Sequence, residues 1–190
     1  MRKLLIRGNS TMPISVGIFN LPPLVTCTPS EWCSEFCYAL KRRYKWKTVK
    51  DANKWRLNQS KKNNFAQKIM EELYNTPSIK YVRIHISGDF YSKDYIEKWA
   101  TIANGFPKII FKTNTKRLDF LKYMKKIFPL NIVARESIDP TRKHRGIFPS
   151  ASIYGTEGSK KFFRCIDNCE KCNFICWHSS KLEIVSSIIR

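Results

Sequence analysis

The sequence predicts an α/β fold in which helices connect the strands of a parallel sheet. Polar and apolar residues alternate over 81–89, short apolar segments follow at 109–114 and 131–135, and amphipathic helical segments separate the three. Strands that alternate with helices in this way form parallel sheets with right-handed crossovers. We therefore expect an α/β core over residues 1–160 and a cysteine-rich tail over residues 161–190 within the same compact unit.

The segment before this pattern predicts one further strand and a long basic helical region. An extended stretch over 14–19 ends at Pro22 and Pro23, which cannot continue regular structure and lead into a loop. From about 34 to 74 the pattern is helical, with Phe65, Ile69 and Leu73 at four-residue spacing. Pro77 ends that region.

The predicted helices and loops downstream follow the same reasoning. Tyr95, Trp99 and Ile102 give one helix an apolar face, and a second helix is expected over about 116–127. Gly, Pro and Ser are frequent over 139–161, which predicts loops, and the tail ends in a final apolar strand or helix.

Composition restricts the setting and the partners. The net charge of +20, from 35 basic and 15 acidic residues, indicates an anionic partner such as nucleic acid, or else a lysine-rich soluble surface. The sequence contains no apolar run of membrane-spanning length, and its first apolar stretch is too short for a signal peptide. We expect a cytoplasmic, reducing location and no membrane partner, and an odd number of cysteines disfavours a disulfide framework.

The seven cysteines fall into two groups that indicate metal centres. Cys27, Cys33 and Cys37 supply three thiolates, which suits a [4Fe-4S] cluster with one open iron; a zinc site completed by a distant His or Asp is the alternative. The second group supplies four thiolates in a short segment, which favours a second [4Fe-4S] cluster and leaves zinc as the alternative. Its members are Cys165, Cys169, Cys172 and Cys176. This group would pass electrons, hold a substrate or simply stabilise the tail.

A Ser87-Gly88-Asp89 turn follows the clearest predicted strand. Ligands of parallel sheets bind outside the carboxyl ends of the strands. At that edge Gly88 would let a ligand approach the backbone, and Asp89 would accept hydrogen bonds from an ammonium group. The alternative is that Asp89 caps the next helix.

The order of these features resembles the radical S-adenosylmethionine (SAM) superfamily. A three-cysteine loop follows the first strand, a Gly-acid turn follows the second, and Thr113-Asn114 follows the third. The cysteine spacing here, Cys-x5-Cys-x3-Cys, is longer than the Cys-x3-Cys-x2-Cys of that superfamily, although Phe36 supplies the aromatic residue before the last cysteine. The resemblance implies a partial, open (β/α) barrel and a cluster whose open iron takes the amino and carboxylate groups of SAM.

The resemblance also implies which side chains would face the cofactor. One polar face of each strand points into the barrel, where His85 would be either a proton-transfer group or a hydrogen-bonded core residue. The implied inward residues are Arg83, His85 and Ser87; Lys112 and Asn114, or else Thr113; and Arg135 and Ser137. The implied cofactor-binding residues are Ser87, Gly88, Asp89, Lys112, Thr113, Asn114, Arg135 and Ser137.

A closer resemblance is to the gene-product-88-like family of phage and prophage proteins. It is carried by the segments Gly8-Asn-Ser10, Phe19-Asn-Leu-Pro-Pro23, Cys37-Tyr-Ala39 and Ser87-Gly-Asp-Phe-Tyr91, and by the cysteine tail. Together these resemblances imply an iron–sulfur protein that reductively cleaves SAM, with an external electron donor and an unknown substrate that nucleic acid would fit. The alternative is a non-enzymatic nucleic-acid-binding protein in which both cysteine groups are structural.

A basic, aromatic stretch keeps that alternative open. Residues 41–47 and 54–56 interleave cations with Tyr44, Trp46 and Trp55, a pattern typical of single-strand binding. Each tryptophan could instead occupy a core position on a helix whose other face is solvated. For each tryptophan taken singly, we favour this core position.

Overall fold

The strands of the protein form one curved, mostly parallel sheet. A computed structural model describes residues 2–152, 162–179 and 183–186. Within them, eight strands lie in the order β1-β2-β3-β4-β5-β6-β8-β7, and only the β1–β2 pair is antiparallel. The strands are β1 (Ile6–Arg7), β2 (Val16–Phe19), β3 (Tyr81–Ile84), β4 (Ile110–Thr115), β5 (Ile132–Ile138), β6 (Ser150–Ser152), β7 (Phe162–Cys165) and β8 (Glu183–Ser186).

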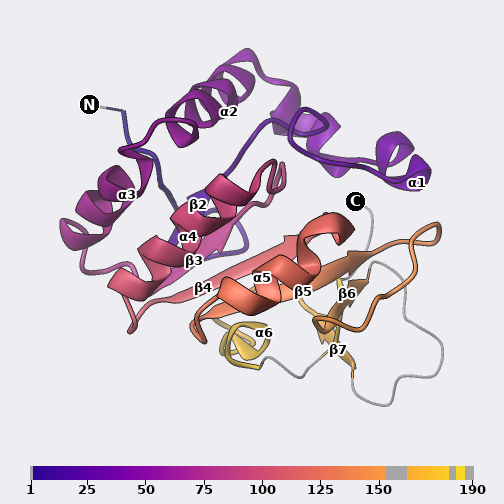
Figure 1. The fold of residues 1–190 in the computed structure, drawn as a ribbon. Coiled ribbons are helices and arrows are strands. Elements are labelled where there is room, and N and C mark those ends of the chain that lie inside the picture. The colour runs from indigo at the N-terminus through magenta and orange to yellow at the C-terminus, as the bar shows by residue number, and fades with distance from the viewer. Residues whose placement is uncertain (1, 153–161, 180–182, 187–190) are drawn as a thin grey trace.

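Most of the helices cover one face of this sheet, while the tail segment around α6 packs on the other (Figure 1). The α-helices are α1 (Glu31–Glu35), α2 (Lys47–Ser60), α3 (Phe65–Tyr74), α4 (Lys93–Gly105), α5 (Leu121–Ile127) and α6 (Ile175–His178). The described residues also form three short 3-10 helices: η1 (Tyr38–Leu40), η2 (Arg42–Lys45) and η3 (Leu118–Phe120). No helix in the described ranges combines the length and apolar character needed to cross a bilayer.

The main core lies between the sheet and helices α2 to α5. Val82 and Ile84 of β3 are fully buried against these helices, as the two-residue alternation predicts. The rings of Phe65 and Trp99 pack edge-on against Phe19 at 5.3 and 5.4 Å between centroids. This aromatic cluster fixes α3 and α4 against the carboxyl ends of β2 and β3.

A second, smaller core lies on the opposite face. Val16 and Ile18 of β2 pack there against Trp177, which is 1% exposed. Tyr81 stacks on Phe174 with 4.0 Å between ring centroids and an interplanar angle of 4°. The cysteine-rich tail is therefore held on the sheet face that the long helices leave open.

The predicted mixed α/β class with a largely parallel sheet is confirmed, and the differences concern element lengths. The long helical region is divided into α1, α2, α3 and two 3-10 turns. The strand predicted over 81–89 ends at Ile84, because His85 has a left-handed φ of +61°. Strand β6 was expected to be a loop. The expected loop over 153–161, and the expected boundary after residue 160, lie outside the described residues.

Candidate metal centre

The first cysteine loop docks on the turn that follows β3. Thr26, next to Cys27, accepts a hydrogen bond from the backbone N–H of Asp89 at 3.1 Å. Ser87 Oγ donates to the carbonyl of Leu21 at 2.9 Å, and Asn20 accepts from the N–H of Ile86 at 2.9 Å. These bonds join segments more than sixty residues apart and place the start of the cysteine loop at the carboxyl edge of the sheet.

Gly88 makes this docking possible. Its φ is +80°, and a Cβ built there would lie 2.5 Å from Leu21 Cβ and 2.8 Å from Thr26 Oγ1. The space in which we expected a ligand to approach Gly88 is thus occupied by the cysteine loop itself. The glycine allows close contact between two chain segments.

Hydrogen bonds to Asp89 connect the turn after β3 to the end of β4. Its buried carboxylate accepts from Phe90 N (2.8 Å), Thr115 Oγ1 (2.7 Å) and Lys116 N (2.7 Å). Burial raises the pKa of this carboxyl group. The helix-cap alternative is wrong, because Ser92 caps α4 by accepting from Tyr95 N. A carboxylate offers about four acceptor sites, so Asp89 keeps one for a further donor.

The three thiols of the first group lie together. The Cys33 thiol donates a hydrogen bond to Cys37, which lowers the pKa of Cys37 to about 7. Cys27 interacts electrostatically with both Cys33 and Asp89, and burial raises its pKa to about 11. All three thiols are partly exposed. They therefore form one group beside the Gly-Asp turn, open to solvent on one side.

A polar rim at the ends of β4 and β5 holds the other side of this loop, and of its members the sequence analysis named Ser137 but missed Ser30, Lys116 and Asp139. Ser30 caps α1 by accepting from Cys33 N at 3.1 Å, and its Oγ donates to Asp139 at 2.7 Å. Lys116 donates to the same carboxylate at 3.0 Å and to Ser137 Oγ at 3.1 Å. The rule that located Ser87–Asp89 would also have found Lys116 and Asp139, because both directly follow strands.

The second cysteine group lies across the other face of the sheet, at α6. Cys169 N donates to the carbonyl of Thr11 at 3.1 Å, which ties the group to the β1–β2 loop. Cys172 and Cys176 are buried, whereas Cys165 and Cys169 are partly exposed. Cys176 interacts electrostatically with both Cys165 and Cys169, and Cys169 also interacts with Cys172, so the four thiols share one neighbourhood.

Three cations of β3, β4 and β5 face this second group. The Lys112 ammonium contacts Cys176 Sγ and lies 5.6 Å from the centre of the Trp177 ring. Arg135 donates to the Cys176 carbonyl at 3.0 Å, and Arg83 interacts electrostatically with Cys165, Cys169 and Cys176. Burial lowers the pKa of Lys112. Lys112 and Arg135 thus lie beside the tail cysteines, on the face opposite the long helices.

The remaining expected residues divide between the two faces. Asn114 accepts from Arg83 at 3.3 Å on the tail side, while Thr113 is fully buried on the helix side, so Lys112 and Asn114 share the sheet face that the tail contacts. His85 also points toward the helices, where Nε2 lies 2.8 Å from the Tyr95 hydroxyl. Burial lowers the pKa of His85 to about 3. His85 is therefore the hydrogen-bonded core residue of the two alternatives, because its left-handed φ reverses the strand alternation.

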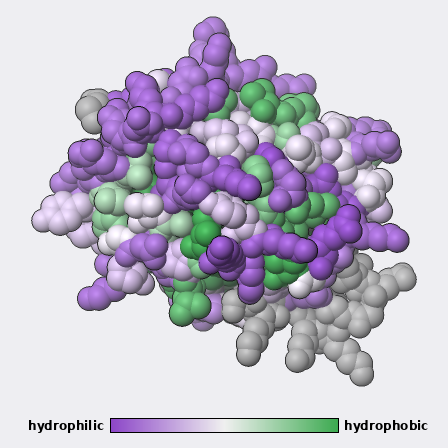
Figure 2. All heavy atoms as spheres, viewed as in Figure 1, coloured by the Kyte–Doolittle hydropathy of each residue, from purple (hydrophilic) through white to green (hydrophobic). Residues whose placement is uncertain are grey.

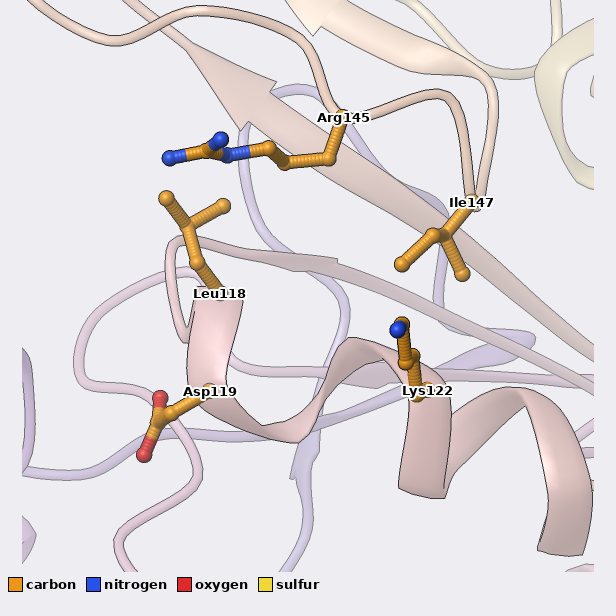
Figure 3. Close-up of a pocket in the computed structure, with 5 residues that line it drawn as sticks. All are labelled: Leu118, Asp119, Lys122, Arg145 and Ile147. Carbon is orange, nitrogen blue, oxygen red and sulfur yellow. The ribbon is translucent and has the colours of Figure 1, made fainter.

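An open pocket of about 500 Å³ is lined by none of the seven cysteines. It is formed by η3 and α5 on one side and by the β5–β6 loop on the other (Figure 3). Figure 3 shows the Arg145 side chain extending over Leu118, with Ile147 opposite Lys122 and Asp119 turned away. None of the predicted site residues lines this pocket.

Among the described residues, no three His, Cys, Asp or Glu side chains are arranged to hold a single metal ion.

Comparisons with known proteins identify a family for this chain. No curated protein matches the chain, and no solved structure matches it either. A family model described as gene product 88 matches residues 2–174, which include the first cysteine loop, the Ser87–Asp89 turn and three of the four tail cysteines. The chain therefore belongs to the gene product 88 family, as its motifs led us to expect.

Proposed function

We propose that this protein is an iron–sulfur enzyme of the radical SAM type, with a [4Fe-4S] cluster held by Cys27, Cys33 and Cys37. The observation that carries the proposal is the docking of the three-cysteine loop on the Ser87–Asp89 turn, at the carboxyl edge of a parallel sheet. Sites for small ligands in such sheets lie at this edge. Within the α/β class, we propose that strands β2 to β6 form a partial, open (β/α) barrel.

The donor set supports this cluster. Three grouped, partly exposed thiols without a neighbouring histidine are soft ligands and suit iron–sulfur chemistry better than oxygen-preferring metals. A cluster bound there would supply one electron, received from an external donor, to the sulfonium of SAM, whose bond to the adenosyl carbon then breaks. Asp89 keeps one acceptor site for the SAM ammonium, and Ser137 offers a hydroxyl nearby on β5.

For the tail cysteines we propose a second, closed metal centre, a [4Fe-4S] cluster with zinc as the alternative. Four thiolates around either metal carry net negative charge, which is costly to bury without compensation. Lys112, Arg135 and Arg83 provide positive charge at this position. The same cations are expected to favour the reduced state of an iron cluster, because that state carries one more negative charge.

Anaerobic purification followed by iron, sulfide and zinc analysis tests both centres. We expect about eight irons per chain if both hold clusters, or about four irons and one zinc if the tail binds zinc. Reduction should give an electron paramagnetic resonance signal that changes when SAM is added, and the reduced protein should release 5′-deoxyadenosine.

Two matched variants separate the groups. Cys33→Ser should abolish the SAM-dependent change in the signal and the release of 5′-deoxyadenosine, whereas Cys172→Ser should leave the SAM-dependent change in place. Iron-replete, anaerobic protein that holds only zinc would refute the proposal. So would a SAM-dependent signal that survives in Cys33→Ser.

A further inference from the structure

The segment between η1 and α2 presents an unusual concentration of exposed positive charge. Within residues 41–47 the cations are Lys41, Arg42, Arg43, Lys45 and Lys47, and all five are exposed. Of these five cations, only Lys47 forms a salt bridge within the part of the chain that the structure describes, a solvent-exposed contact with Asp51. The other four repel one another, and no carboxylate of a described residue is paired to them, an arrangement that an anionic ligand would stabilise.

Aromatic rings lie among these cations. Trp46 is 64% exposed, so the expectation that it belongs to the core is wrong, whereas Trp55 packs partly buried against the main core. Trp46 is exposed because it precedes the first turn of α2, outside the face that α2 buries. An exposed tryptophan loses favourable burial, and surrounding it with cations makes a stacking platform for bases.

The basic segment leads directly to the first cysteine loop. Tyr38 follows Cys37, donates its hydroxyl hydrogen bond to the carbonyl of Ile86, and packs edge-on against Tyr44 at 6.1 Å between ring centroids. Tyr44 in turn interacts electrostatically with Arg43 and Cys37. A chain bound along residues 41–47 would therefore pass beside the three thiols.

We propose that Lys41, Arg43, Lys45 and Trp46 form a binding surface for single-stranded nucleic acid at the border of the three-cysteine loop. Cations that meet phosphates and rings that stack on bases are interleaved here along the chain. A membrane-binding segment instead separates its apolar and cationic residues onto two faces of a helix. Figure 2 shows that hydrophilic side chains cover much of the helical face of the molecule, with smaller hydrophobic areas between them. This proposal does not depend on which metal the cysteines bind.

Binding of a fluorescent single-stranded oligo(dT) of about 20 nucleotides, measured by anisotropy over a range of salt concentrations, tests the proposal. Trp46→Ala should weaken binding roughly 5- to 150-fold, the cost of losing one stacked base. Tyr74→Ala is the control, because Tyr74 is 81% exposed at the end of α3 and lies outside the surface. This control should bind as the unaltered protein does.

Charge removal gives a second, independent measurement. The double variant Arg43→Gln, Lys45→Gln should reduce the slope of log affinity against log salt by about 1.4, because each single-strand phosphate contact contributes about 0.7. The double variant Lys122→Gln, Lys126→Gln removes the same charge from exposed positions on α5 and should leave the slope nearly unchanged. Equal effects of the two double variants, or unaltered binding by Trp46→Ala, would overturn the proposal. Tighter binding to duplex DNA or to anionic lipid vesicles than to the single strand would also overturn it.

Discussion

Replacing Gly88 with alanine tests whether the cysteine loop depends on close docking against β3. The new Cβ would lie 2.5 Å from Leu21 Cβ and 2.8 Å from Thr26 Oγ1, so the loop or the turn must move. The left-handed backbone of Gly88 costs an alanine about 1–2 kcal/mol. Overpacking adds about 1–3 kcal/mol. We therefore expect the free energy of unfolding to fall by about 2–5 kcal/mol.

Gly146→Ala is the matched control, because Gly146 also has a left-handed φ, of +75°, but nothing lies within 4 Å of its Cβ position. This variant should bear only the backbone cost of about 1–2 kcal/mol. For a chain of this size 1 kcal/mol shifts Tm by roughly 2–4 °C. Gly88→Ala should thus lower Tm by roughly 4–20 °C and Gly146→Ala by roughly 2–8 °C.

Thermal unfolding followed by circular dichroism gives the comparison, and iron content after anaerobic reconstitution gives a second readout. Gly88→Ala should also retain less iron than Gly146→Ala, because displacement of Thr26 moves the neighbouring Cys27. Equal loss of stability in the two variants would show that the loop does not pack against Gly88 as described, and the steric argument would be wrong.

Two further predictions concern buried polar groups. The pKa of His85 is lowered from 6.5 to about 3, so between these pH values the unfolded state binds more protons than the folded state. The free energy of unfolding should therefore fall as pH decreases through that range, by up to about 1.36 kcal/mol per pH unit. His85→Gln, which can still hydrogen-bond Tyr95 but cannot be protonated there, should reduce this slope in urea titrations at several pH values; an unchanged slope would assign the pH dependence to other groups. Ser30→Ala removes both the α1 cap and the bond to Asp139 and should lower the free energy of unfolding by about 0.5–2 kcal/mol, whereas the exposed Ser34→Ala should change it by less than about 0.5 kcal/mol. Equal urea midpoints for these two serine variants would contradict the role assigned to Ser30.

Local periodicity predicted the elements that depend on it. The alternation at Val82 and Ile84 and the apolar face of α4 hold in the structure, because each reflects burial of one side of a regular element. The strand was predicted too long because the left-handed backbone at His85 leaves no trace in a two-residue pattern. Trp46 was misassigned for a related reason: its ring was read as part of a helix, whereas the residue precedes the first turn of α2.

The sequence predicted which segments of the candidate site lie together better than it predicted their hydrogen bonds. The grouping of Cys27, Cys33 and Cys37 beside the Ser87–Asp89 turn followed from the order of strands and loops. The sequence did not predict which acceptor sites of the Asp89 carboxylate are already used, because its partners Thr115 and Lys116 lie at the end of the next strand of the sheet. Side-chain hydrogen bonds between distant segments depend on how elements pack, and no sequence spacing records them.

The amino-acid sequence by itself determined the α/β class, the family and the division of the cysteines into three and four, since these follow from residue types and their spacing along the chain. Only the tertiary structure decided that the α6 segment of the tail packs on the face opposite the long helices, so that Lys112 and Arg135 meet Cys176 there. The physical reason is that strand alternation defines two faces of a sheet, whereas the segment that covers each face is selected by packing between residues far apart in the chain.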